Sequence, residues 1–362
     1  MESSTRYEMT TSFKEVNTMV EEVLFDGTVI PTTLHPEINY VVVGIIAAVI
    51  MCTISVVGLL GNSAVLFIIL KYKEMQNITN YFIANLAITD IALLTICTIP
   101  TCLFSANIIK LTDPVCKTIQ YMQFSAVQAT CCTLTAMSID RYYLIVHAVK
   151  SRQTRTTRKA VIINVVIWIG SFVIHFPVFI LSKLKDDSCQ MSFTGFKYYF
   201  LFLVLIMYVI PLSVITACYA NILVIVWRKT SAGTESAQAH ERSIRQKKKT
   251  TRMVFLVILA FALCWLPIHT FNLTIQFQEP PQTTHFIVIM NVFALCLSYA
   301  NSCVNPFIYA FTTATFKKHF KKVFSLRLAE SDTSAGAKDD SVSGYRKVAK
   351  YDMSSVTCDT KV

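Results

Sequence analysis

Seven apolar runs, each long enough to cross a membrane as a helix, constrain this chain more than any other feature of its sequence. They span residues 40–70, 78–109, 118–139, 160–181, 198–227, 253–277 and 286–311. A hydrocarbon core about 30 Å thick takes about 20 helical residues to cross. The composition agrees, because 54% of the residues are hydrophobic and only 15% are charged. We therefore expect an all-α membrane protein with a seven-transmembrane helix bundle, over residues 40–312.

Basic residues cluster on one side of these spans, at 71–73, 150–159, 228–252 and 317–327. Cytoplasmic loops carry an excess of Lys and Arg, so this side is expected to be cytoplasmic. The acidic tail, residues 1–39, would then be extracellular and the carboxy terminus cytoplasmic. The tail lacks a signal-peptide pattern, so the first span would be the signal anchor. The net charge of +11 reflects topology and an attraction for anionic membrane lipids, and it requires no nucleic acid.

Most of the twelve cysteines lie within the spans, and two of those outside them stand on the side expected to be extracellular. Cys116 stands at the outer start of the third span and Cys189 in the loop after the fourth. Both face the oxidising side, where disulfides persist. We pair them, which would draw this loop across the mouth of the bundle. Two uncrosslinked packing thiols are the alternative.

Polar side chains interrupt the apolar spans. Asp90 is the one charge in its span, and a carboxylate near a helix centre costs about 2.5–3.5 kcal/mol on insertion scales. It therefore needs a counter-charge or a proton. We expect a hydrated cation pocket shared by Asp90, Thr130, Asn301 and Asn305. For the asparagines, contacts that hold helices together are the alternative.

Asp140, Arg141 and Tyr142 place a carboxylate and a guanidinium at the inner edge of the third span. Charge at a bilayer boundary is costly enough that a functional role is the first expectation. Its position beside a cationic loop suggests a signalling switch.

Prolines mark breaks in five spans, at Pro100, Pro177, Pro211, Pro267 and Pro306. Each removes a backbone hydrogen bond and bends its helix. Trp265 precedes Pro267 by two residues and follows Phe261 by one helical turn, so an indole stands beside a hinge. A packing residue or the floor of a pocket is the alternative for Trp265.

Together these residues resemble the rhodopsin-class (class A) G-protein-coupled receptors, across residues 40–324. The resemblance rests on Gly61-Asn62, Asn85-Leu86-Ala87 with Asp90, Cys116, Asp140-Arg141-Tyr142, Trp168, Pro211 with Tyr219, Cys264-Trp265-Leu266-Pro267 and Asn305-Pro306-Phe307-Ile308-Tyr309. It implies a ligand-gated exchange factor for a heterotrimeric G protein.

The resemblance also assigns roles to residues. The activation switch would comprise Asp140, Arg141, Tyr142, Tyr219, Phe261, Trp265, Pro267, Asn305, Pro306 and Tyr309. Asp140 would hold Arg141 at rest and release it toward the carboxy-terminal helix of a Gα subunit. The pocket around Asp90 would bind an allosteric sodium ion, and no other cofactor is expected. The Cys116–Cys189 bond would be the disulfide that members of this family carry on the extracellular side.

Two positions narrow the ligand. Gln123 stands where amine receptors carry an aspartate, and Tyr299 where opsins carry the retinal lysine. A small ammonium ligand would lack its counter-ion, and a retinal Schiff base cannot form. A peptide or a lipid remains, and the acidic outer tail suits a cationic peptide.

Segments 127–138, 167–171 and 298–302 look like the kisspeptin receptors, whereas 145–147 and 304–311 resemble galanin and allatostatin-A receptors equally. We place the chain in this cluster, nearest the kisspeptin branch. The resemblance then implies a short amidated neuropeptide as agonist. Kisspeptin resemblance implies Gq, phospholipase C and calcium signalling. Galanin resemblance implies Gi, and this alternative stays open.

The peptide cavity is expected among the outer halves of the third, fifth, sixth and seventh helices. Its lining would comprise Gln120, Gln123, His269, Asn272, Gln276 and Tyr299, with Asp187 and Glu279 as candidates for a cationic side chain of the peptide. Uncharged hydrogen-bonding groups suit an amidated end, which has no carboxylate. Helix–helix contacts, and solvation for the two carboxylates, are the alternatives.

Residues 313–328 alternate aromatic residues and lysines at helical spacing, which predicts an amphipathic helix on the inner leaflet. Residues 329–362 are expected to be a disordered cytoplasmic tail. Phosphorylation of its serines would recruit arrestin. Its end, Thr360-Lys361-Val362, fits a PDZ ligand.

Other functional classes fit less well. The spans carry neither a metal-ligand cluster nor a nucleophile–base pair on one face, so the sequence does not indicate an enzyme. A transporter or channel would need paired broken helices or a continuous polar lining. We therefore expect a multi-pass receptor of the plasma membrane without catalytic residues.

Overall fold

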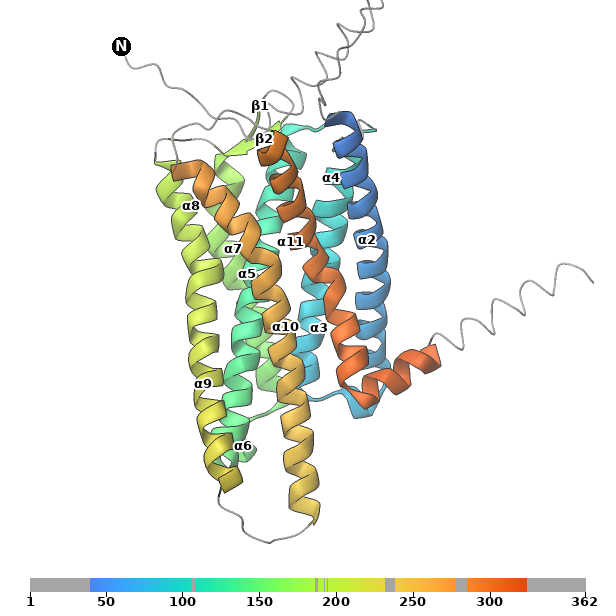
Figure 1. The fold of residues 1–362 in the computed structure, drawn as a ribbon, viewed down its shortest axis with the longest axis vertical. Helices are drawn as coiled ribbons and strands as arrows, with labels where there is room; N and C mark the ends of the chain where they lie inside the picture. The colour runs from blue at the N-terminus through green and yellow to red at the C-terminus, as the bar shows by residue number, and fades with distance from the viewer. Residues whose placement is uncertain are drawn as a thin grey trace, which may run out of the picture.

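The computed structural model describes residues 40–105, 108–185, 188–191, 193, 195–231, 238–277 and 285–323. Long, roughly parallel helices form a bundle (Figure 1). They are α2 (Tyr40–Lys71), α3 (Ile78–Ala92) continuing through η2 (Leu93–Thr98) into α4 (Ile99–Ser105), α5 (Asp113–Val146), α7 (Thr157–Leu181), α8 (Phe196–Val204) continuing through η3 (Leu205–Val209) into α9 (Ile210–Ser231), α10 (Gln238–Phe277) and α11 (His285–Thr312). In chain order these segments match the seven predicted spans. The predicted tails, residues 1–39 and 329–362, lie outside the described residues.

Six helices in the described part of the chain are long and apolar enough to cross a membrane. The other long helix, α5, carries more polar residues along its length, and it contacts α3, α7, α9 and α10. A helix surrounded by other helices meets little lipid and can therefore carry polar side chains. Large apolar side chains of the outer helices, by contrast, are exposed at the surface, as lipid contact requires.

Two of the predicted proline breaks are wide π-helical turns. Leu93–Thr98 precedes Pro100, and Leu205–Val209 precedes Pro211. A proline ring clashes with the carbonyl four residues earlier in a regular helix, and a wider turn gives it room. Pro177, Pro267 and Pro306 instead lie inside continuous helices.

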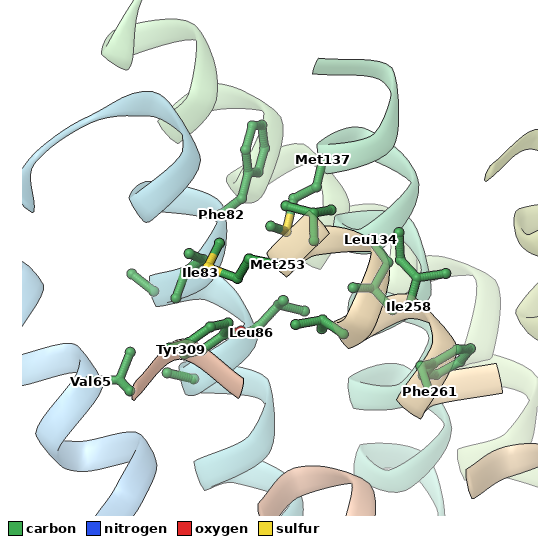
Figure 2. Close-up of a cluster of buried hydrophobic side chains, with 14 of the residues drawn as sticks. Val65, Phe82, Ile83, Leu86, Leu134, Met137, Met253, Ile258, Phe261 and Tyr309 are labelled. Carbon is green, nitrogen blue, oxygen red and sulfur yellow. The ribbon is translucent and has the colours of Figure 1, made fainter. Parts of the chain in front are cut away.

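The main hydrophobic core joins α2, α3, α5, α10 and α11 (Figure 2). Val65, Ile83, Leu134, Met253 and Tyr309 are each 2% exposed or less. Because side chains from these helices, and from α7, α8 and α9 as well, meet here, a rotation or shift of one helix must repack the others. This core therefore couples the helices mechanically.

Hydrogen bonds donated by polar side chains also tie helices together. Trp168 Nε1 of α7 donates to Asn85 Oδ1 (2.9 Å), and Asn85 Nδ2 of α3 donates to the Thr133 hydroxyl of α5 (2.7 Å). Asn62 Nδ2 of α2 donates to the Ser302 carbonyl of α11 (2.7 Å). Asn62 and Asn85 thus act as contacts between helices, a common use of polar residues within membrane spans.

A two-stranded antiparallel hairpin covers one end of the bundle (Figure 1). Strand β1 (Ser182–Lys185) pairs with β2 (Ser188–Met191), with Leu184 opposite Cys189. The predicted Cys116–Cys189 disulfide is present and ties the hairpin to the start of α5. Asp113 adds a second anchor, because its Oδ1 accepts from the Leu184 N–H at 2.9 Å.

At the opposite end, two short helices border the bundle. Helix α6 (Ala148–Thr154) follows α5, and a further helix over residues 314–323 follows α11 and turns across the bundle axis (Figure 1). In the latter, Phe316, Phe320 and Val323 are buried, whereas its four lysines, Lys317, Lys318, Lys321 and Lys322, are exposed. The amphipathic helix predicted from the sequence is confirmed over these residues. Phe324 and residues 325–328 lie outside the described residues.

Candidate functional site

Arg141 sits near the carboxy-terminal end of α5, at the end of the bundle opposite the hairpin, which is called the inner end below, and its side chain is 3% exposed. Its Nη2 donates to Asp140 Oδ2 at 2.7 Å and also to the hydroxyl of Thr79, near the start of α3. Thr79 is positioned because Asn77 caps α3 by accepting from the Asn80 N–H at 3.1 Å. The guanidinium is therefore held from two helices. Tyr142, the next residue, is half-buried and packs edge-on against Tyr143 and His147.

Asp140 has a second cationic partner that the sequence analysis missed. Arg155 donates from Nε to Oδ1 (2.6 Å) and from Nη2 to Oδ2 (2.8 Å) of Asp140. Two parallel bonds of this kind are the strongest geometry for a guanidinium and a carboxylate. Arg155 belongs to the basic cluster at 150–159, which is expected to be cytoplasmic, and this cluster is the one signal in the sequence that points to it.

Two of the three tyrosines of the predicted switch, Tyr219 and Tyr309, form no hydrogen bond with Arg141, although Tyr219 is close enough to interact with it electrostatically. Tyr219 donates to the Thr251 carbonyl of α10 at 3.4 Å. Tyr309 is fully buried and stacks on Phe316, with 5.6 Å between ring centroids. Its hydroxyl has no hydrogen-bond partner among the described residues. Arg141 is thus held by Asp140 and Thr79, and not by a hydrogen bond to either tyrosine.

Asp90 lies in the middle of the bundle and is 2% exposed. Asn305 Nδ2 donates to its Oδ2 at 2.9 Å, which joins α3 to α11 immediately before Pro306. Asn301, one turn earlier on α11, is 3% exposed. Thr130 of α5 is also buried, but its hydroxyl donates to Thr89 at 3.1 Å. Of the four predicted residues, Asp90 and Asn305 are thus in direct contact.

The donor set around Asp90 suits a small hard cation. Asn301 Oδ1 and Asn305 Oδ1, from the predicted set, are buried oxygens without a hydrogen-bond partner in the described part of the chain. Carboxylate and amide oxygens are preferred ligands of hard cations. No group of three or more His, Cys, Asp or Glu side chains within the described residues could hold a metal ion. The residues present therefore fit an alkali cation better than a transition metal.

A row of aromatic rings follows one face of α10 outward from the core. Phe261 and Trp265 lie 6.1 Å apart, and Trp265 stacks on His269 at 5.7 Å. Tyr208 of η3 packs against Phe261 and His269 and donates its hydroxyl to the Ala262 carbonyl at 2.7 Å. This row crosses the turn at Pro267, so the rings span the predicted hinge.

The predicted ligand residues continue this face of α10. His269, Asn272 and Gln276 are spaced three and four residues apart and so share a face. His269 Nε2 and Asn272 Oδ1 are buried and have no hydrogen-bond partner among the described residues. Gln276 is half-buried, as are Gln120 and Gln123 of α5.

Tyr299 occupies a different environment. It is 2% exposed and belongs to a second buried cluster, with Met51 of α2, Leu93 and Cys97 of η2, and Cys102 of α4. The structure therefore places Tyr299 among the helices α2, α4 and α11, apart from the polar face of α10. Asp187 and Glu279 lie outside the described residues.

Comparison with known proteins gives a consistent result. Residues 61–309 match the sequence profile of the 7 transmembrane receptor (rhodopsin family). G-protein coupled receptor 54 of Oreochromis niloticus is 36% identical over 290 residues, which cover 75% of this chain and 76% of that receptor. The human KiSS-1 receptor is 35% identical over 287 residues, covering 74% of this chain and 71% of that receptor. Somatostatin receptor type 2 of Mus musculus is 33% identical over 304 residues, which cover 80% of this chain and 79% of that receptor.

The matched residues, 61–309, include Asp140 with its arginine partners, Asp90 with Asn305, the aromatic row on α10 and the Cys116–Cys189 disulfide. The described helices supply the membrane-spanning bundle that this family requires. The resemblance to kisspeptin receptors is likewise supported by the relatives. This chain is a multi-pass membrane receptor, not an enzyme, and it belongs to the rhodopsin family of seven-transmembrane receptors.

Proposed function

We propose that this chain is a receptor for a short, carboxy-amidated neuropeptide that activates a heterotrimeric G protein. The observation that carries the proposal is the outer face of α10, where His269 Nε2 and Asn272 Oδ1 are buried without partners among the described residues. Buried polar groups in folded proteins are normally hydrogen-bonded. An uncharged peptide end offers both donors and acceptors to such groups and brings no carboxylate that would need a cation.

The printed names of the relatives support a peptide of the kisspeptin type. Two of the relatives reported above are G-protein coupled receptor 54 and a KiSS-1 receptor. From the resemblance we propose coupling to Gq, with phospholipase C and calcium signalling. A galanin- or allatostatin-A-like peptide with Gi coupling is the alternative, and the somatostatin receptor among the relatives keeps other peptides in view.

Further partners belong to the same proposal. The G protein would bind the end of the bundle that carries Arg141, α6 and the helix over 314–323, facing the cytoplasm.

Sodium would bind at Asp90 with Asn301 and Asn305, and Thr130 would complete the pocket. The tail beyond 328 would bind arrestin when phosphorylated, and Thr360-Lys361-Val362 a PDZ domain. The amino terminus would face outward, with Asp187 and Glu279 near a cationic side chain of the peptide.

The test is expression in cells with parallel calcium and cAMP readouts. Each peptide of a panel is applied as the amide and as the free acid, and lipids form a third arm. We expect submicromolar calcium responses to an amidated peptide and much weaker responses to its acid form. A cAMP decrease without calcium would instead favour the Gi alternative. Responses to lipids alone would refute a peptide ligand.

Variants then test the binding face. His269→Ala and Asn272→Ala should each lower peptide potency about tenfold, because a buried hydrogen bond is lost. Thr270→Ala is the matched control, since Thr270 lies on the same helix but is exposed and bonds its own backbone at Leu266. Gln123→Ala should also lower potency. Full potency in the His269 and Asn272 variants would remove the face of α10 from the site, and full potency in Gln123→Ala would remove Gln123 of α5 from it.

A further inference from the structure

Arg155 is held in place by the ends of two helices. Its backbone caps α6 by donating to the Ser151 carbonyl at 3.1 Å, and it has an extended conformation with φ −84° and ψ 121°. The next residue, Thr156, caps α7, with its side chain accepting from the Lys159 N–H at 3.3 Å. Two consecutive capping residues fix the chain direction between α6 and α7. The Arg155 side chain is therefore presented to Asp140 by local backbone structure.

Asp140 is shared unequally between its two guanidinium partners. Arg155 makes one bond to each carboxylate oxygen, whereas Arg141 makes a single bond to Oδ2. Arg141 and Arg155 are also close enough to interact unfavourably as like charges. A carboxylate that is engaged on both oxygens by one cation holds a second cation less firmly.

We propose that Arg155 is a positioning residue of the activation switch, which loosens the hold of Asp140 on Arg141 and keeps Asp140 paired after Arg141 leaves. The physical reason lies in the cost of an unpaired charge. Asp140 has a side chain only 9% exposed, and removing the partner of a buried charge is strongly unfavourable. With Arg155 in place, release of Arg141 leaves Asp140 with two intact hydrogen bonds. The inference rests on the proposed function, since release of Arg141 matters only to a receptor that couples to a G protein.

The experiment measures nucleotide exchange on a Gα subunit by full-length receptor in membranes, with and without agonist. Arg155→Ala should lower basal exchange, and raise the agonist concentration for half-maximal exchange, by about two- to fivefold, the range measured for partly exposed ion pairs. Arg155→Lys should fall between wild type and Arg155→Ala, because it keeps the charge but loses the paired geometry. In an Asp140→Asn background, Arg155→Ala should change nothing further.

Arg158→Ala is the matched control and should leave exchange unchanged. Arg158 lies three residues on, is exposed, and forms no ion pair within the described part of the chain. The exchange rate of each variant is divided by the amount of receptor at the cell surface. If Arg155→Ala does not reach the cell surface, the comparison is made with Arg155→Lys.

Three results would overturn the inference. Higher basal exchange in Arg155→Ala would make Arg155 a clamp of the resting state. Unchanged exchange would make the pair energetically neutral. An equal loss in the Asp140→Asn background would mean that Arg155 acts through another partner. Failure of the wild-type receptor to act on any Gα subunit would instead refute the proposed function.

Discussion

Arg141 is restrained by a carboxylate on its own helix and by a hydroxyl on α3, and it lies far from the polar face of α10. We predict that Arg141→Ala binds agonist with near-normal affinity but loses G-protein activation. Ligand binding depends on the outer half of the bundle, whereas exchange requires a free guanidinium at the inner end. Agonist binding and nucleotide exchange measured on the same membranes check both halves of the statement.

Thr79→Ala is a useful companion, because it removes one of the two restraints while leaving Arg141 intact. It should raise basal exchange, the opposite direction from Arg141→Ala. Exchange that persists in Arg141→Ala, or agonist binding that disappears with it, would contradict the assigned role.

Asp90 provides a prediction about ions. If sodium binds beside Asp90 and favours the arrangement in which Arg141 is paired with Asp140, replacing choline with sodium at constant ionic strength should lower agonist affinity in the wild type. Asp90→Asn keeps the size of the side chain but removes its charge, so agonist affinity should no longer respond to sodium. Competition binding in the two salts measures the effect. A sodium response that survives in Asp90→Asn would place the ion elsewhere.

The residue scale also shows what sequence could not reveal. Asp140 and Arg141 are neighbours on one helix, so their pairing followed from adjacency and position. Arg155 lies 15 residues from Asp140, and its contact depends on how α6 ends and α7 begins. Likewise, the sequence placed Thr130 at the level of Asp90, but the direction of its hydroxyl, toward Thr89, depends on side-chain packing.

At the scale of elements, the contact between α2 and α11 depends on a glycine. A Cβ added to Gly61 would lie 2.8 Å from Cγ and 3.0 Å from Cβ of Pro306. The proline ring cannot swing aside, so the helices would have to separate. We predict that Gly61→Ala destabilises the receptor by about 1–3 kcal/mol, as overpacking usually does.

Gly170 supplies the control for this prediction. It lies inside α7, and an added Cβ would meet nothing within 4 Å. Gly170→Ala should therefore be neutral or slightly stabilising. Thermal unfolding of the two purified variants, followed by cysteine accessibility or tryptophan fluorescence, compares them directly. Equal melting temperatures would show that α2 and α11 can move apart at little cost.

The hairpin at the outer end gives a prediction about pH. The ion pair with Lys117 at 2.6 Å, and then the Leu184 N–H, lower the pKa of the Asp113 carboxyl. A carboxyl with a lowered pKa contributes stability above its usual value of about 3.9 and loses it only as the pH falls through the lowered value. The Leu184 contact should thus stay intact from pH 8 to pH 5.

Hydrogen exchange at the Leu184 amide, corrected for the intrinsic effect of pH, measures this contact. Protection should be constant across that range in the wild type and weaker in Asp113→Ala at every pH. Asp113→Asn should keep much of the protection, because an amide oxygen can still accept the hydrogen bond. Loss of wild-type protection between pH 6 and pH 5 would contradict the lowered pKa.

The helices were easier to predict from the sequence than the contacts of individual side chains. An apolar run of about 20 residues has few folds open to it in lipid, so the order and number of spans followed from hydropathy. The two π-helical turns before Pro100 and Pro211 could not be located, because a proline permits a kink, a wide turn or a straight helix. Helix α5 extends beyond its apolar run at both ends, because these ends leave the hydrocarbon and the apolar signal stops there.

At the scale of the whole molecule, the outer and inner ends are joined by the core. The aromatic row on α10 runs from His269 through Trp265 to Phe261, and Phe261 belongs to the same buried cluster as Met253 and Tyr309 (Figure 2). A ligand that moves the rings at the outer end must therefore repack the core shared by α2, α3, α5 and α11. Close-packed cores switch between discrete arrangements more readily than they deform continuously.

This connection makes agonist and G protein mutually dependent. By thermodynamic linkage, a G protein that raises agonist affinity by some factor must have its own affinity raised by agonist by the same factor. Typical factors are about 5 to 150. We predict that Trp265→Ala shrinks this factor, because it removes the ring between His269 and Phe261. Two measurements give this factor independently. One is the agonist affinity with and without nucleotide-free G protein, and the other is the G-protein affinity with and without agonist. If Trp265→Ala lowered agonist affinity equally with and without G protein, Trp265 would be the floor of the pocket and the connection would run through other residues.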